Sequence, residues 1–282
     1  MKPAPFAYCK ARSLDDAIDL LGRHGEGARL LAGGQSLIAT LNARLSAPHT
    51  LIDINGLAGL DRIERRNGTI EIGALVRHAQ AERARDIAEH APLLARALPH
   101  IAHPAIRNRG TIGGSIAFAD PAAELPACLL ALGGEVEIVG PTGKRMVAAD
   151  HFFTGLFETA LGVHDVLTAI RIPAATPDSR IGFAEFARRR GDYAMVGLAA
   201  SARAAGSDLA DLRLAFFGVG VTPLRAKQAE AALASGRLDE AVAALQSALD
   251  PPGDIQASGA VKKHLACVLL RRVARQLAEP RA

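Results

Sequence analysis

The chain has 282 residues, of which 49% are hydrophobic and 22% charged, and its formal net charge is +4. This is the composition of a globular protein that is long enough for two domains. It contains no apolar run of the roughly 18 residues that span a membrane, and its first residues lack the apolar segment of a secretory signal. We therefore expect a cytoplasmic protein. The mild charge and the scarcity of aromatic residues argue against a nucleic-acid partner.

The three cysteines, Cys9, Cys128 and Cys267, are far apart in the sequence. None belongs to a Cys-x-x-Cys pair, and the nine histidines form no His-Glu-x-x-His pattern. We therefore expect neither a metal site within this chain nor a disulfide framework. Any redox chemistry would need an organic cofactor.

The N-terminal part of the chain alternates predicted helices and strands. Ser13, followed three residues later by Asp16, is a helix N-cap, and glycines at 22 and 25 end that helix. The other elements expected here are a strand at 28–31, a helix at 36–44 and a strand at 51–54.

The middle part predicts two hairpins with helices between them. Asn67-Gly68 lies between two short runs rich in β-branched residues and is a strong signal for a β-hairpin. The other elements expected here are helices at about 78–88, 92–98 and 121–131, a second hairpin at 136–147 and a strand at 166–172.

Residues 174–179, Ala-Ala-Thr-Pro-Asp-Ser, are typical of a linker. The elements expected beyond it are strands near 181–189, 194–204 and 212–221, then alanine-rich helices, the last at about 258–278. Strands followed by helices indicate an α+β domain, so we place a domain boundary after residue 175.

Two glycine-containing segments carry the ligand chemistry. One is Ala32-Gly33-Gly34-Gln35-Ser36-Leu37, and the other is Arg107-Asn108-Arg109-Gly110-Thr111-Ile112-Gly113-Gly114-Ser115. Glycines let the backbone turn its N–H groups toward an anion and let a ligand approach closely. Two such segments suggest one long ligand with a diphosphate, held from two sides. A glycine pair can also be an ordinary turn, and the two arginines either balance the ligand's charge or are simply exposed.

Three further side chains extend this pattern. Asp120, before Pro121, is either a helix N-cap only or part of the site. Glu124 is either a solvated helix residue or an acceptor for the 2′- and 3′-hydroxyls of a ribose. Tyr193 ends the segment Arg188-Arg189-Arg190-Gly191-Asp192-Tyr193, and its ring either covers the core or lies against a planar heterocycle.

With these residues together, the chain resembles the FAD-binding medium subunit of molybdenum hydroxylases, the relatives of carbon monoxide dehydrogenase and xanthine dehydrogenase. The resemblance covers essentially the whole chain. It is carried by Ala32–Leu37, Thr111–Ser115, Asp120-Pro121-Ala122-Ala123-Glu124-Leu125-Pro126-Ala127, Leu167–Pro173 and Gly191-Asp192-Tyr193. Each motif alone is weak or moderate, but their order and spacing together are highly specific.

The resemblance implies an α+β fold with two domains. Residues 1–175 would form a FAD-binding domain of the vanillyl-alcohol-oxidase (PCMH) type, with subdomains of about 1–57 and 58–175. Residues 176–282 would form a C-terminal flavoprotein domain of the carbon monoxide dehydrogenase type. In that domain a three-stranded antiparallel sheet would pack on helices and close over the flavin.

The resemblance also implies the residues that contact FAD. The diphosphate and ribityl region would lie on Ala32, Gly33, Gly34, Gln35, Ser36, Leu37, Thr111, Gly113, Gly114 and Ser115. Glu124 would contact the adenosine ribose, and Tyr193 would lie near the isoalloxazine. The chain departs from the family's frequent residues at Gln35, Ser115 and Phe118. These departures concern individual side-chain contacts with FAD. The expected backbone contacts depend on the glycines, which are unchanged.

The partners of the chain are likewise implied by the resemblance. A small subunit would carry two [2Fe–2S] clusters, and a large subunit would carry a molybdopterin cytosine dinucleotide-type cofactor and bind the organic substrate. Electrons would pass through the clusters to FAD on this chain and then to an external acceptor. The chain would thus be an oxidoreductase subunit with no catalytic acid or base of its own, in a dimer of heterotrimers.

Two other functions fit the same residues. A stand-alone FAD-dependent oxidase or dehydrogenase of this fold would carry its own substrate cavity and often a covalently attached flavin. A nucleotide-binding scaffold subunit would have no redox role and no flavin absorbance. The visible spectrum of the native complex tests the scaffold alternative, and acid-releasable FAD without turnover of organic substrates would favour the subunit over the stand-alone enzyme.

Overall fold

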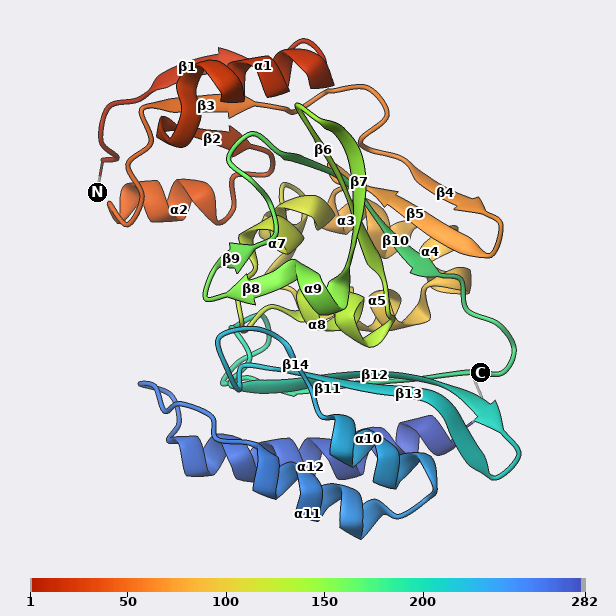
Figure 1. Cartoon of the computed structure of the whole chain (residues 1–282). Helices are drawn as coiled ribbons and strands as arrows, with labels where there is room; N and C mark the ends of the chain where they lie inside the picture. Colours follow the sequence, from red (N-terminus) through yellow and green to blue (C-terminus); the bar gives the residue numbers. More distant parts are fainter. Residues whose placement is uncertain (1, 280–282) are drawn as a thin grey trace.

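The computed structural model describes residues 2–279, which form three units stacked from the top to the bottom of Figure 1. The N-terminal unit is a parallel sheet with strand order β1-β3-β2. Its elements are β1 (Ala7–Lys10), α1 (Leu14–His24), a 3₁₀ turn (Gly25–Gly27), β2 (Ala28–Leu31), α2 (Leu37–Asn42) and β3 (Thr50–Asp53). Ser13 caps α1 as predicted, because its hydroxyl accepts the Asp16 N–H at 3.0 Å.

The second unit is an antiparallel sheet with strand order β4-β5-β10-β6-β7. Its strands are β4 (Ile63–Arg66), β5 (Thr69–Gly73), β6 (Glu135–Gly140), β7 (Gly143–Ala148) and β10 (Val166–Pro173), with a small hairpin of β8 (Phe153–Gly155) and β9 (Glu158–Thr159) beside them. Both predicted hairpins are confirmed. In the first, Asn67 and Gly68 have φ values of 49° and 77°, as a two-residue type I′ turn requires.

Helices cover this second sheet and fill the space below it in Figure 1. They are α3 (His78–Arg83), α4 (Arg85–His90), α5 (Pro92–Ala97), a 3₁₀ turn (Leu98–His100), α6 (Pro104–Arg107), α7 (Ile112–Phe118), α8 (Glu124–Ala131) and α9 (Ala149–Phe152). The single helix expected at 78–88 is two helices, because Ala84 has extended backbone angles and separates them. The helix expected from 121 begins at Glu124, since the Asp120 carboxylate accepts the Ala122 N–H at 2.9 Å and holds a turn there.

The C-terminal unit is an antiparallel sheet with order β11-β12-β13-β14, followed by three helices. Its elements are β11 (Ser179–Phe186), β12 (Val196–Ala205), β13 (Asp208–Phe217), β14 (Leu224–Arg225), α10 (Lys227–Ala234), α11 (Leu238–Ala248) and α12 (Gly259–Ala278). The three strands expected here are present, but β14 adds a fourth strand of two residues, so the expected three-stranded sheet is four-stranded. No element within residues 2–279 is a helix long and apolar enough to cross a membrane.

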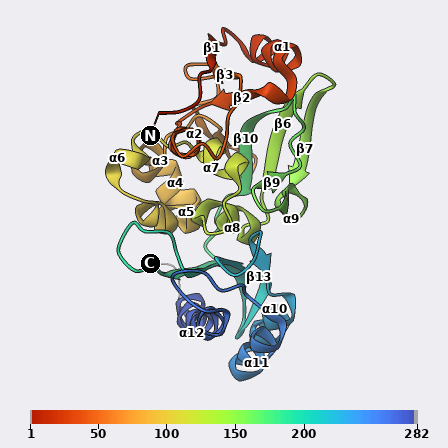
Figure 2. The ribbon, with the colours of Figure 1, turned by 90° about the vertical axis from the view of Figure 1, so that its left-hand side faces the viewer.

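Both faces of the C-terminal sheet are buried. Leu198 and Phe216 belong to a core shared with the C-terminal helices. Their neighbours Ala199 and Phe217 belong to the core of the second unit, which includes α5 and α8. Successive strand residues point to opposite faces, so the sheet lies between two helical layers (Figures 1 and 2). The same core therefore joins the C-terminal unit to the second unit.

Candidate functional site

A cavity of about 880 Å³ lies where the three units meet. This volume is in the range of sites for cofactor-sized ligands. All twelve residues that the sequence singled out for a cofactor contribute to its wall: Ala32, Gly33, Gly34, Gln35, Ser36, Leu37, Thr111, Gly113, Gly114, Ser115, Glu124 and Tyr193. They come from the loop between β2 and α2 with the first residue of α2, from the first turns of α7 and α8, and from the loop between β11 and β12.

The two glycine segments are in direct contact. A Cβ atom built on Gly33 would lie 2.3 Å from the Arg109 carbonyl oxygen and 2.9 Å from the Gly110 Cα. No side chain fits at these distances, so only glycine at 33 lets the two segments touch. The contact makes one continuous wall from parts of the chain that are far apart in sequence.

The first segment has the free amides that an anion site requires. Among residues 2–279, the N–H groups of residues 33–36 have no acceptor within hydrogen-bonding distance. Gly34 adopts a φ of +72°, a left-handed conformation that glycine reaches without strain. The Gln35 side chain instead donates to the Gly33 carbonyl oxygen at 3.1 Å. The backbone of this segment, more than its side chains, is available to a ligand.

The second segment differs from what the sequence suggested. Its end forms the N-cap and first turn of helix α7, and the N–H groups of residues 112–115 are already used within the protein. Gly113 N–H donates to Ala74 O at 2.9 Å, Gly114 N–H donates to the Thr111 hydroxyl at 3.1 Å, and Ser115 N–H donates to Thr111 O at 3.1 Å. The expectation of a second nest of free N–H groups is therefore wrong. Thr111 acts as the helix N-cap, and this satisfies donors that a turn would have left open.

The glycines of this second segment serve close packing. A Cβ on Gly113 would lie 2.5 Å from the Ala74 Cβ, so Gly113 lets α7 lie directly against the end of β5. A Cβ on Gly114 would meet no atom within 4 Å other than those of Thr111, the nearest being the hydroxyl at 2.7 Å. Gly114 thus leaves space on the cavity side of α7.

His78 belongs to the site and was missed by the sequence reasoning. It is 3% exposed, and its Nε2 lies 2.9 Å from Thr111 O and 3.0 Å from the Ser115 hydroxyl. Burial lowers the pKa of His78 to about 4, so the imidazole is neutral at neutral pH. Since a carbonyl only accepts, Nε2 carries the proton. A lone histidine after a strand gives no motif that could have identified this role.

Carboxyl groups gather at the start of α8. Glu124 is 8% exposed, and its burial raises the pKa of the carboxyl to about 7. Glu185 from β11 lies nearby and receives a hydrogen bond at 3.0 Å from His100 Nδ1, which raises the pKa of His100. Burial also raises the pKa of Asp120. Glu124 is therefore a desolvated carboxyl on the cavity wall, and its alternative as a solvated helix residue is wrong.

The two arginines that could have balanced a ligand's charge lie elsewhere. Arg107 is 9% exposed; it donates to Glu82 at 3.0 Å and to the carbonyl of Ile101 at 3.0 Å. Its guanidinium thus stabilises the loop before α6. Arg109 lines a second cavity of about 740 Å³ on another side of the first glycine segment.

Apolar residues close another part of the main cavity. Phe118, at the end of α7, lines it and packs at 5.1 Å between ring centroids against Phe157 of the β8–β9 turn. Leu161 and Val163, from the loop between β9 and β10, also line it. Tyr193, on the opposite unit, remains 59% exposed at the cavity edge. Within residues 2–279 no group of three or more His, Cys, Asp or Glu is arranged to hold a metal ion.

Comparison with known proteins finds two family models that match the chain. Residues 4–175 match the family model described as the FAD binding domain in molybdopterin dehydrogenase, and residues 181–277 match the CO dehydrogenase flavoprotein C-terminal domain. The chain is 38% identical to the 6-hydroxypseudooxynicotine dehydrogenase complex subunit alpha of Paenarthrobacter nicotinovorans, over 96% of this chain and 94% of that protein. It is 37% identical to the nicotine 6-hydroxylase medium subunit of the same organism, over 96% and 97%.

A solved structure has the same fold. The carbon monoxide dehydrogenase from Hydrogenophaga pseudoflava that lacks the Mo-pyranopterin moiety of the molybdenum cofactor contains a chain that superposes with a TM-score of 0.95. The two chains are 35% identical, and the match covers 98% of each.

Proposed function

The chain belongs to the family of FAD-binding medium subunits of molybdenum hydroxylases, and from this membership we propose that it is the electron-transfer subunit of such a complex. Its relatives are subunits of oxidoreductase complexes, and some are named medium subunits or medium chains, which implies partner subunits. The partners of this chain would be a small iron–sulfur subunit and a large molybdopterin subunit.

The residues around the cavity fit FAD. The free amides of residues 33–36 would bind the diphosphate, because oriented N–H groups at the start of a helix favour an anion. Gly114 leaves room beside them for the ribityl chain, with Thr111, Gly113 and Ser115 behind it. Glu124 would accept hydrogen bonds from the adenosine ribose, and Tyr193 would lie near the isoalloxazine.

When bound, FAD would supply the redox chemistry of electron transfer between the [2Fe–2S] clusters of the small subunit and an external acceptor. The chain's own residues bind and orient the cofactor and exclude water from it. His78 keeps Thr111 and Ser115 in place as a neutral donor. None of these roles requires a catalytic acid or base in this chain.

The relatives support a division of labour between subunits. Their names refer to the related pyridine compounds nicotine and 6-hydroxypseudooxynicotine and to carbon monoxide, a diatomic gas that is chemically unlike the other two. A conserved medium-subunit fold beside such different substrates is expected if the substrate binds to another subunit. We further propose that residues 1–175 and 176–282 are the two functional domains. The cytoplasmic location and the dimer of heterotrimers remain predictions.

The observation that carries this proposal is the joining of both glycine segments, Glu124 and Tyr193 around one cavity. The test is the visible absorption spectrum of the native complex, followed by acid precipitation. We expect flavin bands and FAD released into the supernatant. A complex without flavin absorbance would refute the proposal, and flavin that stays with the precipitated chain would point to a stand-alone flavin oxidase.

A further inference from the structure

Helix α8 connects the cavity to the C-terminal unit. All eight of its residues are buried, so it is held on every side by packed atoms. Its first residue, Glu124, lines the cavity, and its last residue, Ala131, lies against the C-terminal sheet. A short helix packed in this way moves as a rigid body, because interiors are close-packed. Contacts that fix the C-terminal end of α8 therefore also influence the position of Glu124 at its N-terminal end.

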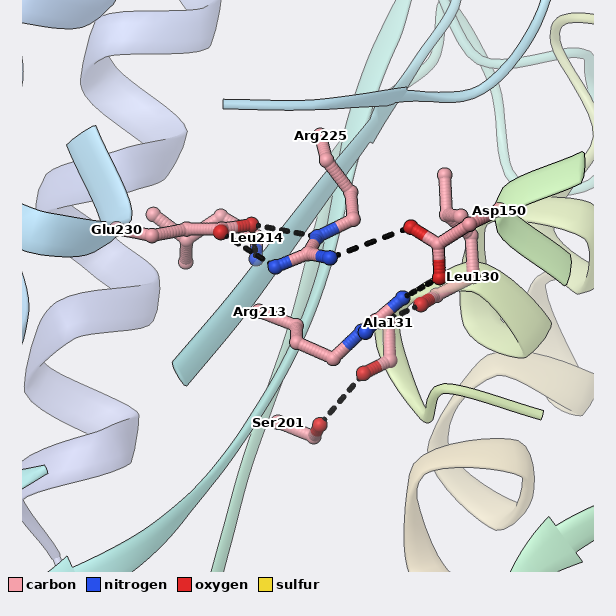
Figure 3. A network of polar contacts seen from close by, with 8 residues as sticks. All are labelled: Leu130, Ala131, Asp150, Ser201, Arg213, Leu214, Arg225 and Glu230. Carbon is pink, nitrogen blue, oxygen red and sulfur yellow. Dashed lines mark hydrogen bonds and ion pairs between the residues drawn. The ribbon is translucent and has the colours of Figure 1, made fainter. Parts of the chain in front are cut away.

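Two side chains of the C-terminal sheet bind the end of α8. Arg213 Nε donates to the Leu130 carbonyl at 2.9 Å, and the Ser201 hydroxyl donates to the Ala131 carbonyl at 2.7 Å (Figure 3). Ser201 and Arg213 are directly paired across strands β12 and β13, so both reach toward the same helix end. The final carbonyls of a helix lack partners within the helix and carry partial negative charge. The Ser201 hydroxyl and the Arg213 guanidinium provide hydrogen-bond donors to these carbonyls, and the guanidinium also provides a positive charge.

A chain of alternating charges holds Arg213 in place. Arg213 also pairs with Asp150 of α9, and Asp150 accepts from Arg225 of β14 at 3.2 Å. Arg225 in turn pairs at 2.6 Å with Glu230 of α10, whose other oxygen accepts the Leu214 N–H at 2.8 Å (Figure 3). Burial alone would raise the pKa of Asp150, but the hydrogen bonds and positive charges of Arg213 and Arg225 hold that pKa below its ordinary value. The network thus joins the second unit to the C-terminal unit at the end of α8.

From this geometry we propose that Ser201 and Arg213 are positioning residues for the cofactor, which set the place of Glu124 through helix α8. The inference rests on the proposed role of Glu124 toward FAD. It gives the C-terminal unit a second contribution to the site besides Tyr193. Because coupling between two sites is reciprocal, bound FAD in turn strengthens the contact between the two units.

The test is a double-mutant cycle on FAD affinity in the full-length chain, measured by quenching of FAD fluorescence. Ser201→Ala removes the bond to Ala131 O, and Ser201→Thr is the matched control that keeps the hydroxyl. Arg213→Lys keeps the charge beside Asp150 but cannot also reach Leu130 O. Arg203→Lys, on an exposed arginine of β12 paired with Asp211, controls for the substitution itself. Each variant is made alone and together with Glu124→Gln.

We expect Ser201→Ala and Arg213→Lys each to weaken FAD affinity by about fivefold to tenfold, while Ser201→Thr and Arg203→Lys leave it unchanged. In the Glu124→Gln background the same substitutions should change affinity by less than about twofold. Equal losses in both backgrounds would overturn the inference, because the effect would then not pass through Glu124. If Glu124→Gln alone leaves FAD affinity intact, the proposed role of Glu124 fails instead. A lower melting temperature with unchanged affinity would show that the contacts only stabilise the fold.

Discussion

Glu124, the residue proposed to bind the adenosine ribose, should lower the free energy of unfolding of the FAD-free chain at neutral and alkaline pH. Its pKa rises from 4.5 to about 7 on burial, which corresponds to about 3 kcal/mol of unfavourable free energy when the group is ionised. The folded state binds the proton more tightly than the unfolded chain. The cost is therefore absent below about pH 4.5, grows between about pH 4.5 and 7, and is complete above that range.

Glu124→Gln replaces this carboxyl by a neutral group of similar shape. We expect the FAD-free variant to be more stable than the parent by up to about 3 kcal/mol at pH 8, or about 5 °C in melting temperature for a chain of this length. The same variant should bind FAD more weakly by about 1–3 kcal/mol, because a charged acceptor for hydroxyl groups is lost. Stability and affinity should thus change in opposite directions.

The assay combines thermal melts of the FAD-free chain at several pH values with equilibrium titration of FAD. Glu135→Gln is the matched control, since Glu135 is exposed on β6 and the same chemical change there should alter neither quantity. A Glu124→Gln variant that is no more stable than the parent above pH 7, or whose added stability persists at about pH 4.5, would contradict the cost assigned to the buried carboxylate.

Two other substitutions test the wall of the cavity. Gly33→Ala places a Cβ 2.3 Å from the Arg109 carbonyl oxygen; it should separate the glycine segments, destabilise the chain by roughly 3 kcal/mol or more and remove bound flavin. Gly22→Ala meets no atom within 4 Å and should be neutral or slightly stabilising, so equal behaviour of the two variants would contradict the contact. Burial lowers the pKa of His78 from 6.5 to about 4, so its stabilising contribution is present above pH 6.5 and is lost as pH falls toward 4, a loss of about 3 kcal/mol. His78→Gln should be less sensitive to acid over this interval, and identical pH–stability profiles of variant and parent would show that His78 is not held neutral.

Local patterns in the sequence were sufficient for much of the fold. The Ser13 cap, the Asn67-Gly68 turn and the three long strands of the C-terminal sheet depend on nearest-neighbour preferences and alternation, and the structure has all of them. The residues that line the main cavity were also identifiable. Glycines beside hydroxyls, an acid and a tyrosine formed motifs whose order resembled one family. In the structure these residues line one cavity.

Tertiary contacts decided what each of these residues does. The segment at 111–115 appeared to be an open turn, yet it is helical, because Thr111 caps it and Ala74 of a neighbouring segment accepts the Gly113 N–H. The sequence left Glu124 as either a solvated helix residue or a ribose acceptor, and only its burial, which raises the pKa of the carboxyl, excludes the first alternative. His78 belongs to no motif and joins the site only through the approach of α7.

The sequence alone was thus sufficient to predict which residues line the main cavity, because glycine placement and hydrophobic alternation are local properties of the chain. The sequence could not show which backbone N–H groups are free, that the Glu124 carboxyl is desolvated, or that Arg213 donates a hydrogen bond to the end of α8. Hydrogen-bond partners and burial are properties of atoms distant in sequence. Only the packing of the three units around one cavity decides which amides stay free and which are already used by the protein.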